Sequence, residues 1–178
     1  MLRPLAALLL TTLLAACAAP GGPTPGGPTP APAAWQSARM VKPPSPLQCV
    51  PFTRERSGLQ IYGDAWTWWR AAEGHFLRTN RPSVGSVLVL RRTGRLHAGH
   101  LAVVTRVINS RQVIVDHANW LNRGMVHVNA PVIDVSAAND WSVVRVWYIP
   151  GDTLGARAYP AHGFIHPRRI AAVPGAAS

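Results

Sequence analysis

The chain has 178 residues, of which 48% are hydrophobic, and this is enough for one domain with a modest core. Its 18 Lys and Arg residues against 7 Asp and Glu give a formal net charge of +11, which favours anionic partners. Its arginines are scattered along the chain and Lys42 is its single lysine, whereas proteins that read DNA or RNA carry clustered basic residues. Nucleic acid is therefore not an expected partner.

Residues 1–16 have the layout of a secretory signal peptide. Arg3 gives the basic start, Leu5–Leu14 is apolar, and small residues precede Cys17. The apolar run is too short to span a bilayer as a permanent helix. The sequence therefore predicts an exported protein.

The four residues from Leu14 to Cys17 resemble the lipobox of bacterial lipoproteins, in which the cysteine is acylated and becomes the new N-terminus. This resemblance implies that Cys17 is lipidated and anchors the protein to a membrane. A plain signal peptide cut after Ala16 or Ala19 is the alternative. Ala18 follows the cysteine, and by the same resemblance this implies a periplasmic protein anchored to the outer membrane.

Composition divides the rest of the chain into three parts. Residues 17–45 are rich in Pro, Gly, Ala and Thr and predict a solvated tether, because such a segment buries too little apolar surface to fold. Residues 46–151 have the patterning of a folded domain. Residues 152–178 are rich in Ala, Pro and Arg, and we expect a basic, largely disordered tail.

A helix is predicted over Ala65–Glu73, with Asp64 as N-cap and Gly74 as C-cap. Its apolar face repeats at helical spacing and consists of Ala65, Trp68, Trp69 and Ala72. Core packing is the simplest interpretation of these tryptophans. Trp66 lies off that face and is a candidate sugar-stacking side chain.

Strand-like runs dominate the second half of the domain. They are Val84–Leu90, His100–Ile108, Arg111–Val115, Val126–Val128 and Trp141–Ile149. Asn109-Ser110 joins the second run to the third as a tight hairpin. Helices followed by antiparallel strands predict an α+β fold.

A lone cysteine precedes a helix-compatible run. With Cys17 lipidated, Cys49 has no partner for a disulfide, and a helix N-terminus or a neighbouring imidazole can turn a thiol into a nucleophile. His100 opens a strand and is the candidate imidazole. The simplest alternative for Cys49 is a small buried hydrophobic residue.

An imidazole that transfers protons needs a third group to orient it. His117, Asn119 and Asp116 stand at the end of the strand after His100, and we favour His117. Asp116 ranks behind because neighbouring residues of a strand face opposite sides. A zinc site at His97, His100 and His117 is the alternative, but the ligand spacing is not a recognised one, and no metal is expected.

Five segments, in order, resemble the CHAP domain, a family of cysteine- and histidine-dependent amidohydrolases and peptidases of bacterial cell-wall turnover. The segments are Gln48-Cys49, Gly63-Asp64-Ala65, Pro82–Val87, Gly99–Val104 and His117-Ala118-Asn119-Trp120. The resemblance covers about residues 45–150. It implies a papain-like α+β fold in which N-terminal helices pack on an antiparallel β-sheet.

The resemblance also implies roles for individual residues. Cys49 is the nucleophile, His100 is the general base and then the acid, and Gln48 with the Cys49 N–H is a candidate oxyanion stabiliser. The family usually has Glu where His117 stands, although the related NlpC-like endopeptidases resemble a Cys-His-His arrangement. Asn119 matches the family's Asn two residues further on.

The expected function is hydrolysis of an amide bond in peptidoglycan without a cofactor, as an endopeptidase or an N-acetylmuramoyl-L-alanine amidase. Trp66 and Trp120 are the candidate substrate-binding aromatics. One alternative is a peptidoglycan-binding lipoprotein without activity. Another is an amidase or transpeptidase that acts on a different small amide.

Overall fold

The computed structural model describes residue 35 and residues 37–120 and 124–169, all within one compact unit, Ala31–Ser178. The predicted signal peptide, the lipidation site Cys17 and most of the predicted tether lie outside the described residues. In the described part of the chain, no helix has the length and apolar character needed to cross a bilayer.

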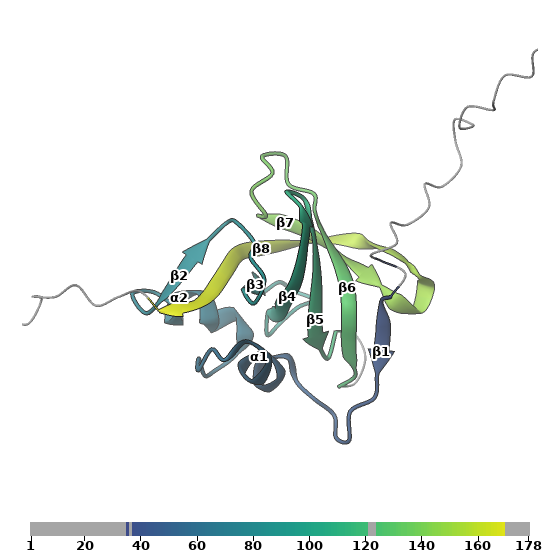
Figure 1. The fold of residues 1–178 in the computed structure, drawn as a ribbon, viewed down its shortest axis with the longest axis horizontal. Helices are drawn as coiled ribbons and strands as arrows, with labels where there is room; N and C mark the ends of the chain where they lie inside the picture. The colour runs from purple at the N-terminus through teal and green to yellow at the C-terminus, as the bar shows by residue number, and fades with distance from the viewer. Residues whose placement is uncertain (1–34, 36, 121–123, 170–178) are drawn as a thin grey trace, which may run out of the picture. The chain divides into compact units, whose positions relative to one another are not determined.

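An antiparallel sheet of eight strands forms the centre of this unit (Figure 1). The strands are β1 (Arg39–Val41), β2 (Phe76–Thr79), β3 (Val87–Leu90), β4 (His100–Asn109), β5 (Gln112–Ala118), β6 (Val126–Asp134), β7 (Val143–Tyr148) and β8 (Thr153–Arg169). Their order is β1-β6-β5-β4-β3-β8-β2, and β7 pairs with both β6 and β8. The strands β3 to β8 therefore close into a six-stranded barrel.

The helical segments are short. They are α1 (Cys49–Ser57), η2 (Ala65–Thr67), α2 (Trp68–Ala71) and η3 (Ile149–Gly151). Helix α1 ends at Gly58, whose φ of 75° is left-handed and whose N–H donates to the Arg54 carbonyl. The predicted helix over Ala65–Glu73 is thus a 3₁₀ turn followed by one α-helical turn.

Strand alternation divides the apolar side chains into two cores. Leu88 on β3 and Val104 on β4 point into the barrel, where they pack with Trp141 and Phe164. Their neighbours on the other face, of which Leu101 is one, pack against the helical segments on the outside of the barrel. Trp68, with 0% of its surface exposed, fills this second core, which confirms the packing role predicted for it.

The predicted α+β class is confirmed, and the five strand-like runs correspond to β3 to β7, with shifted ends. The prediction of a disordered tail is wrong for residues 153–169, which form β8 and pair with β7, β3 and β2. Its buried Tyr159, Phe164 and Ile165 supply the apolar surface that pays for ordering this segment.

The predicted tether also ends earlier than residue 45. Arg39–Val41 forms β1, which pairs with β6. Trp35 packs edge to face on Trp147, with ring centroids 5.0 Å apart. A tryptophan and a strand pairing therefore attach the end of this Pro-rich segment to the barrel.

Candidate active site

Cys49 is the first residue of α1, and the preceding Gln48 is extended, with φ −98° and ψ 157°. The thiol is partly buried against the core between α1 and the barrel. Burial raises the pKa of Cys49 above its usual 9.0, and backbone hydrogen bonds from Leu101 and Val50 act in the opposite direction. The Leu101 contact places the sulfur beside the start of β4.

His100 opens β4, and its ring lies inside the end of the barrel with 3% of its surface exposed. Its Nε2 lies 2.9 Å from Nδ1 of His117 on the neighbouring strand β5. Since Nε2 is occupied by this contact, Nδ1 is the nitrogen that remains for a thiol. The structure therefore brings the two imidazoles into hydrogen-bond contact. In the described residues no hydrogen bond joins the Cys49 thiol to His100.

His127 on β6 is a third buried imidazole, which is not apparent from the sequence pattern. It is the cross-strand partner of His117, and the two rings meet at 84° with centroids 5.0 Å apart. The sequence does place a histidine near the start of the strand that follows His117. Only the register of β5 on β6, however, shows that this histidine lies beside His117.

Burial lowers the pKa of all three imidazoles, because it disfavours their charged forms. Burial lowers the pKa of His100 to about 3, helped by the charge on His127. It lowers the pKa of His127 to about 4 and holds the pKa of His117 well below 6.5, with the charges on His100 and His127 adding to the effect there. The three rings are therefore neutral at pH 7.

Asn119 contacts the residue before the nucleophile candidate instead of the His100 ring. Its Nδ2 donates to Gln48 Oε1 at 2.7 Å, and its Oδ1 accepts from the Gly124 N–H at 2.7 Å. Its backbone is left-handed, with φ 58°, and its own N–H donates to the Met125 carbonyl. These bonds fix the amide of Gln48 beside the N-terminus of α1.

Asp116 faces the helix side of the sheet, away from the two imidazoles, as the strand alternation predicted. Arg56 of α1 donates to its Oδ2 at 3.0 Å, and the backbone N–H of Asn129 donates to its Oδ1 at 2.9 Å. This carboxylate therefore joins α1 to the sheet.

The two candidate substrate aromatics differ in exposure. Trp120 is 3% exposed and packs between His100 and Tyr159, with centroid distances of 4.8 and 4.9 Å. Trp66 is 42% exposed, and its Nε1 donates to Asp64 at 3.3 Å. Trp120 is thus no surface shelf, whereas Trp66 keeps an accessible ring.

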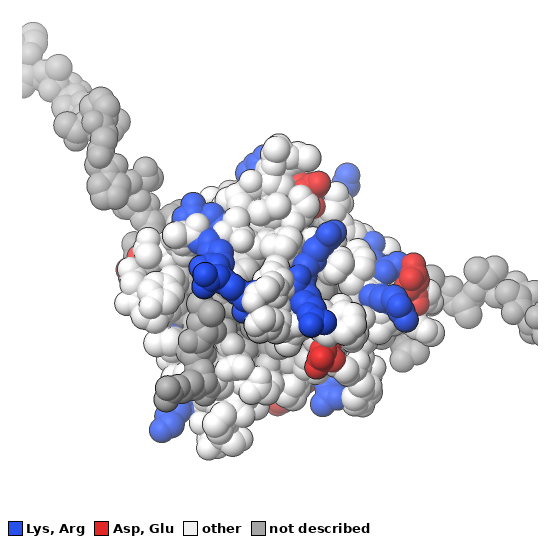
Figure 2. Space-filling model, turned by 180° about the vertical axis from the view of Figure 1, so that it is seen from behind, with Lys and Arg blue, Asp and Glu red and all other residues white. Residues whose placement is uncertain are grey.

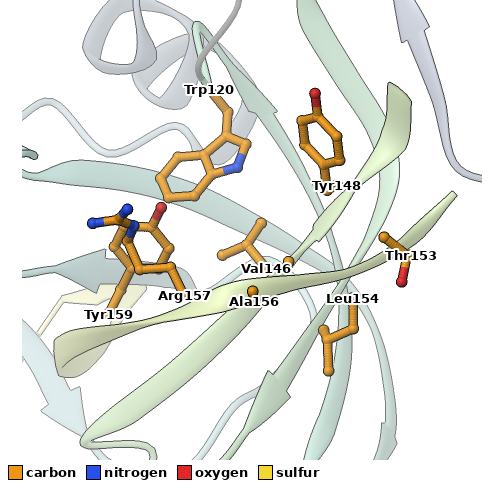
Figure 3. A pocket seen from close by; sticks show the side chains of 9 residues that line it. Trp120, Val146, Tyr148, Thr153, Leu154, Ala156, Arg157 and Tyr159 are labelled. Carbon is orange, nitrogen blue, oxygen red and sulfur yellow. The ribbon is translucent and has the colours of Figure 1, made fainter. Parts of the chain in front are cut away.

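A cavity of about 520 Å³ is lined by Trp120, whose ring also packs on His100 (Figure 3). Val146 and Tyr159 line it from the barrel interior, and Tyr148 and Arg157 line it from β7 and β8. Elsewhere, on the face drawn in Figure 2, basic side chains stand in separate groups among uncharged residues, and few acidic ones accompany them. This distribution fits an overall attraction for anions better than one basic binding patch.

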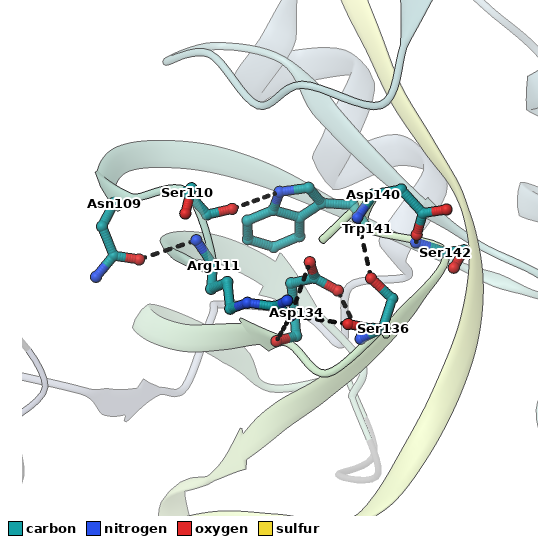
Figure 4. A network of polar contacts seen from close by, with 8 residues as sticks. All are labelled: Asn109, Ser110, Arg111, Asp134, Ser136, Asp140, Trp141 and Ser142. Atoms are coloured by element: carbon teal, nitrogen blue, oxygen red, sulfur yellow. Dashed lines mark hydrogen bonds and ion pairs between the residues drawn. The ribbon is translucent and has the colours of Figure 1, made fainter. Parts of the chain in front are cut away.

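The other end of β4 and β5 carries a structural polar network (Figure 4). Asp134, whose side chain is 0% exposed, accepts from the Ser136 N–H at 2.8 Å and pairs with Arg111 at 3.5 Å. Trp141 Nε1 donates to the Ser110 carbonyl at 3.0 Å. The network holds the β6–β7 loop against the β4–β5 turn.

Within the described residues, no group of three or more His, Cys, Asp or Glu side chains is arranged to hold a metal ion. The zinc alternative at His97, His100 and His117 therefore gains no support from the geometry.

Comparison with known proteins adds a family match. Among solved structures, the chain is similar to an N-acetylmuramoyl-L-alanine amidase from Staphylococcus aureus, at 22% identity and a TM-score of 0.42. The alignment covers 64% of this chain and 30% of that one, so this chain spans less than a third of that amidase. No curated protein matches. Residues 41–119 match the CHAP domain family, and this match confirms the resemblance predicted from the sequence.

Proposed function

We propose that this protein hydrolyses an amide bond in peptidoglycan, with Cys49 as nucleophile, His100 as general base and acid, and His117 as the group that orients His100. The observation that carries the proposal is the 2.9 Å contact between His100 Nε2 and His117 Nδ1, beside the N-terminus of the helix that begins at Cys49. The CHAP domain match over residues 41–119 supports it.

The reaction is an acyl transfer in two steps. In the first, the Cys49 sulfur attacks the amide carbonyl while His100 Nδ1 takes the thiol proton, and His100 then gives that proton to the leaving amine. In the second, His100 takes a proton from water, which attacks the thioester and releases the acid. The sulfur leaves as thiolate, recovers the proton from His100, and the resting thiol is restored.

His117 Nδ1 accepts a hydrogen bond from the N–H at His100 Nε2. This leaves His100 Nδ1 unprotonated and able to accept the thiol proton. A neutral imidazole stabilises the transient imidazolium less than a carboxylate does, because it carries no charge. The low pKa of His100, about 3, likewise disfavours the protonated imidazole. We therefore expect general-base catalysis from a neutral thiol and a neutral imidazole, not a resting thiolate–imidazolium pair.

Gln48 and Asn119 complete the proposed site. Because Gln48 Oε1 accepts from Asn119 at 2.7 Å, its amide is fixed in orientation and its NH₂ group remains available as a donor. Together with the Cys49 N–H it is the candidate oxyanion hole for the tetrahedral intermediate. Asn119 is thus a positioning residue that acts through Gln48.

The test is incubation of the mature protein with purified peptidoglycan, with mass spectrometry to detect new amino groups. Cys49→Ala and His100→Ala are expected to abolish product formation, and substitution of the exposed His75 by Gln serves as the control. Activity that survives in Cys49→Ala would refute the proposed nucleophile. The mass of the product identifies the cleaved bond, either within the stem peptide or between muramic acid and alanine.

A peptidoglycan-binding protein without activity is the second candidate. The raised pKa of Cys49 and the low pKa of His100 favour it, and among the described residues no carboxylate forms a hydrogen bond with His100. It predicts that the protein sediments with peptidoglycan sacculi but releases no amine from them, whereas the hydrolase does both.

The location of the protein is a separate proposal. Lipidation of Cys17 and attachment to the outer membrane from the periplasmic side would hold the domain near peptidoglycan. Incorporation of labelled palmitate that disappears in Cys17→Ser tests the lipid, and membrane fractionation tests the location.

A further inference from the structure

The cavity beside Trp120 has an apolar floor and a basic rim. Trp120, Val146 and Tyr159 are all at least nine-tenths buried, and their side chains form the floor (Figure 3). Arg157, an exposed residue of β8, lines the rim. A volume of about 520 Å³ is within the range of pockets that hold small ligands.

The Tyr159 hydroxyl is a polar group at this floor, and the Arg157 guanidinium lies on the same side of the cavity. Burial raises the pKa of Tyr159, and the positive charges of Arg157 and Arg95 act in the opposite direction. In Figure 3 the Arg157 guanidinium and the Tyr159 hydroxyl extend to the same side of the cavity, toward Trp120.

Protein groups do not neutralise this positive charge. In the described part of the chain, neither Arg157 nor Arg95 forms an ion pair, and no group accepts a hydrogen bond from the Tyr159 hydroxyl. The residues that line the cavity include no Asp or Glu. A carboxylate would supply acceptor oxygens for the Arg157 guanidinium and the Tyr159 hydroxyl, which are both hydrogen-bond donors.

The cavity is adjacent to the imidazole pair. The Trp120 ring packs on two other rings, with centroid distances of 4.8 Å to His100 and 4.9 Å to Tyr159. Trp120 therefore contacts both the imidazole pair, through His100, and a residue that lines the cavity, Tyr159. A peptide that enters the cavity therefore lies one aromatic ring away from His100.

We propose that this cavity binds the carboxylate-bearing end of a peptide, with its apolar side chain on Trp120 and Val146 and its carboxylate at Arg157 and the Tyr159 hydroxyl. That this peptide is the stem peptide of the substrate rests on the proposed function. If the protein is not a peptidoglycan hydrolase, the proposal that the cavity binds a peptide carboxylate remains.

The test uses full-length mature protein with Cys49→Ala, so that no turnover occurs. Two probes are titrated: acetyl-Ala-Leu-Ala with a free carboxylate and the same tripeptide as carboxamide. The readout is the NMR signal of the Trp120 indole N–H, identified by its loss in Trp120→Phe. We expect the acid to shift this signal with saturation, and the carboxamide to bind about tenfold more weakly, as loss of a charge-assisted hydrogen bond predicts.

Variants at the rim separate specific from general attraction. Arg157→Gln is expected to weaken binding of the acid about tenfold and leave carboxamide binding unchanged, while Arg157→Lys keeps part of the affinity. Arg81→Gln is the matched control, because Arg81 is an exposed arginine that lines a different pocket, with Asn109 at the far end of β4. It should not alter the affinity.

Equal affinity for acid and carboxamide, an equal loss in Arg157→Gln and Arg81→Gln, or a Trp120 signal that does not respond would overturn the proposal. Activity on peptidoglycan distinguishes this failure from failure of the proposed function. An active wild-type enzyme with an unresponsive cavity refutes the cavity alone. An inactive wild type whose cavity binds the acid refutes the hydrolase alone.

Discussion

Acidification from pH 6.5 to pH 4.5 is expected to lower the free energy of unfolding by about 4 kcal/mol through two buried imidazoles. The pKa of His100 is about 3 and that of His127 is about 4, against 6.5 when unfolded. At pH 4.5 the unfolded chain protonates both, while the folded barrel keeps them mostly neutral. At 1.36 kcal/mol per pH unit, each contributes about 2 kcal/mol over this interval.

The sign follows from the direction of the shifts. A depressed histidine pKa leaves stability intact above pH 6.5 and removes it as the pH falls toward the folded value. His117 is shifted in the same direction and adds to the loss. Because domains of this size are stable by only about 5–15 kcal/mol, such a loss brings the protein close to unfolding.

Urea unfolding followed by tryptophan fluorescence at pH 6.5, 5.5 and 4.5 measures the effect. Carboxylates also titrate in this range, so the informative comparison is with His127→Gln, whose pH dependence should be about 2 kcal/mol smaller than that of the wild type. His75→Gln changes an exposed imidazole outside the barrel and should match the wild type. Identical pH dependence in wild type and His127→Gln would refute the burial argument.

Other expected outcomes concern the thiol, a loop and the polar network. Alkylation of Cys49 by iodoacetamide at pH 7 should run below about 1% of its plateau rate and rise about tenfold per pH unit, because its pKa exceeds 9.0; a flat profile from pH 6 to 9 would show a thiolate–imidazolium pair instead. Gly99→Ala should cost about 1–3 kcal/mol in urea unfolding, because its φ is +68° and a Cβ would lie 2.9 Å from the Trp66 backbone nitrogen; unchanged stability would contradict this. Asp134→Ala should cost about 1–3 kcal/mol in the same assay by leaving the Ser136 N–H without its acceptor, and Glu55→Ala, at an exposed position of α1, should not.

Period-two patterns made most of the sheet predictable. Val84–Leu90 and His100–Ile108 read as strands because alternate residues face two different cores, and β-branched side chains fill both. The closure of the barrel was not predictable, because it depends on β8. Residues 153–169 contain Gly, Pro and Ala at spacings that hide the few buried aromatics, so composition alone indicates disorder.

The candidate site was predictable where chain order and alternation decide. His100 and His117 meet because a short turn joins their strands, and Asp116 faces away because it is the adjacent residue. His127 was missed because its importance comes from pairing with His117 across β5 and β6, which depends on register. The contact of Asn119 with Gln48 depends on a left-handed backbone and a loop geometry that no periodic pattern encodes.

The two halves of the proposed reaction centre belong to separate layers of the molecule. Cys49 is the first residue of α1, whereas the His100 ring lies among the side chains that fill the barrel. The apolar contacts around Leu101 and Val103 help to set the spacing between them, together with the Gln48–Asn119 and Arg56–Asp116 hydrogen bonds. Changes in the volume of these apolar side chains, which take no part in the reaction themselves, would shift the sulfur and the imidazole relative to each other. A displacement of about 1 Å is enough to cost two orders of magnitude in rate. Screening for faster or slower variants should therefore begin with the buried side chains around Leu101 and Val103.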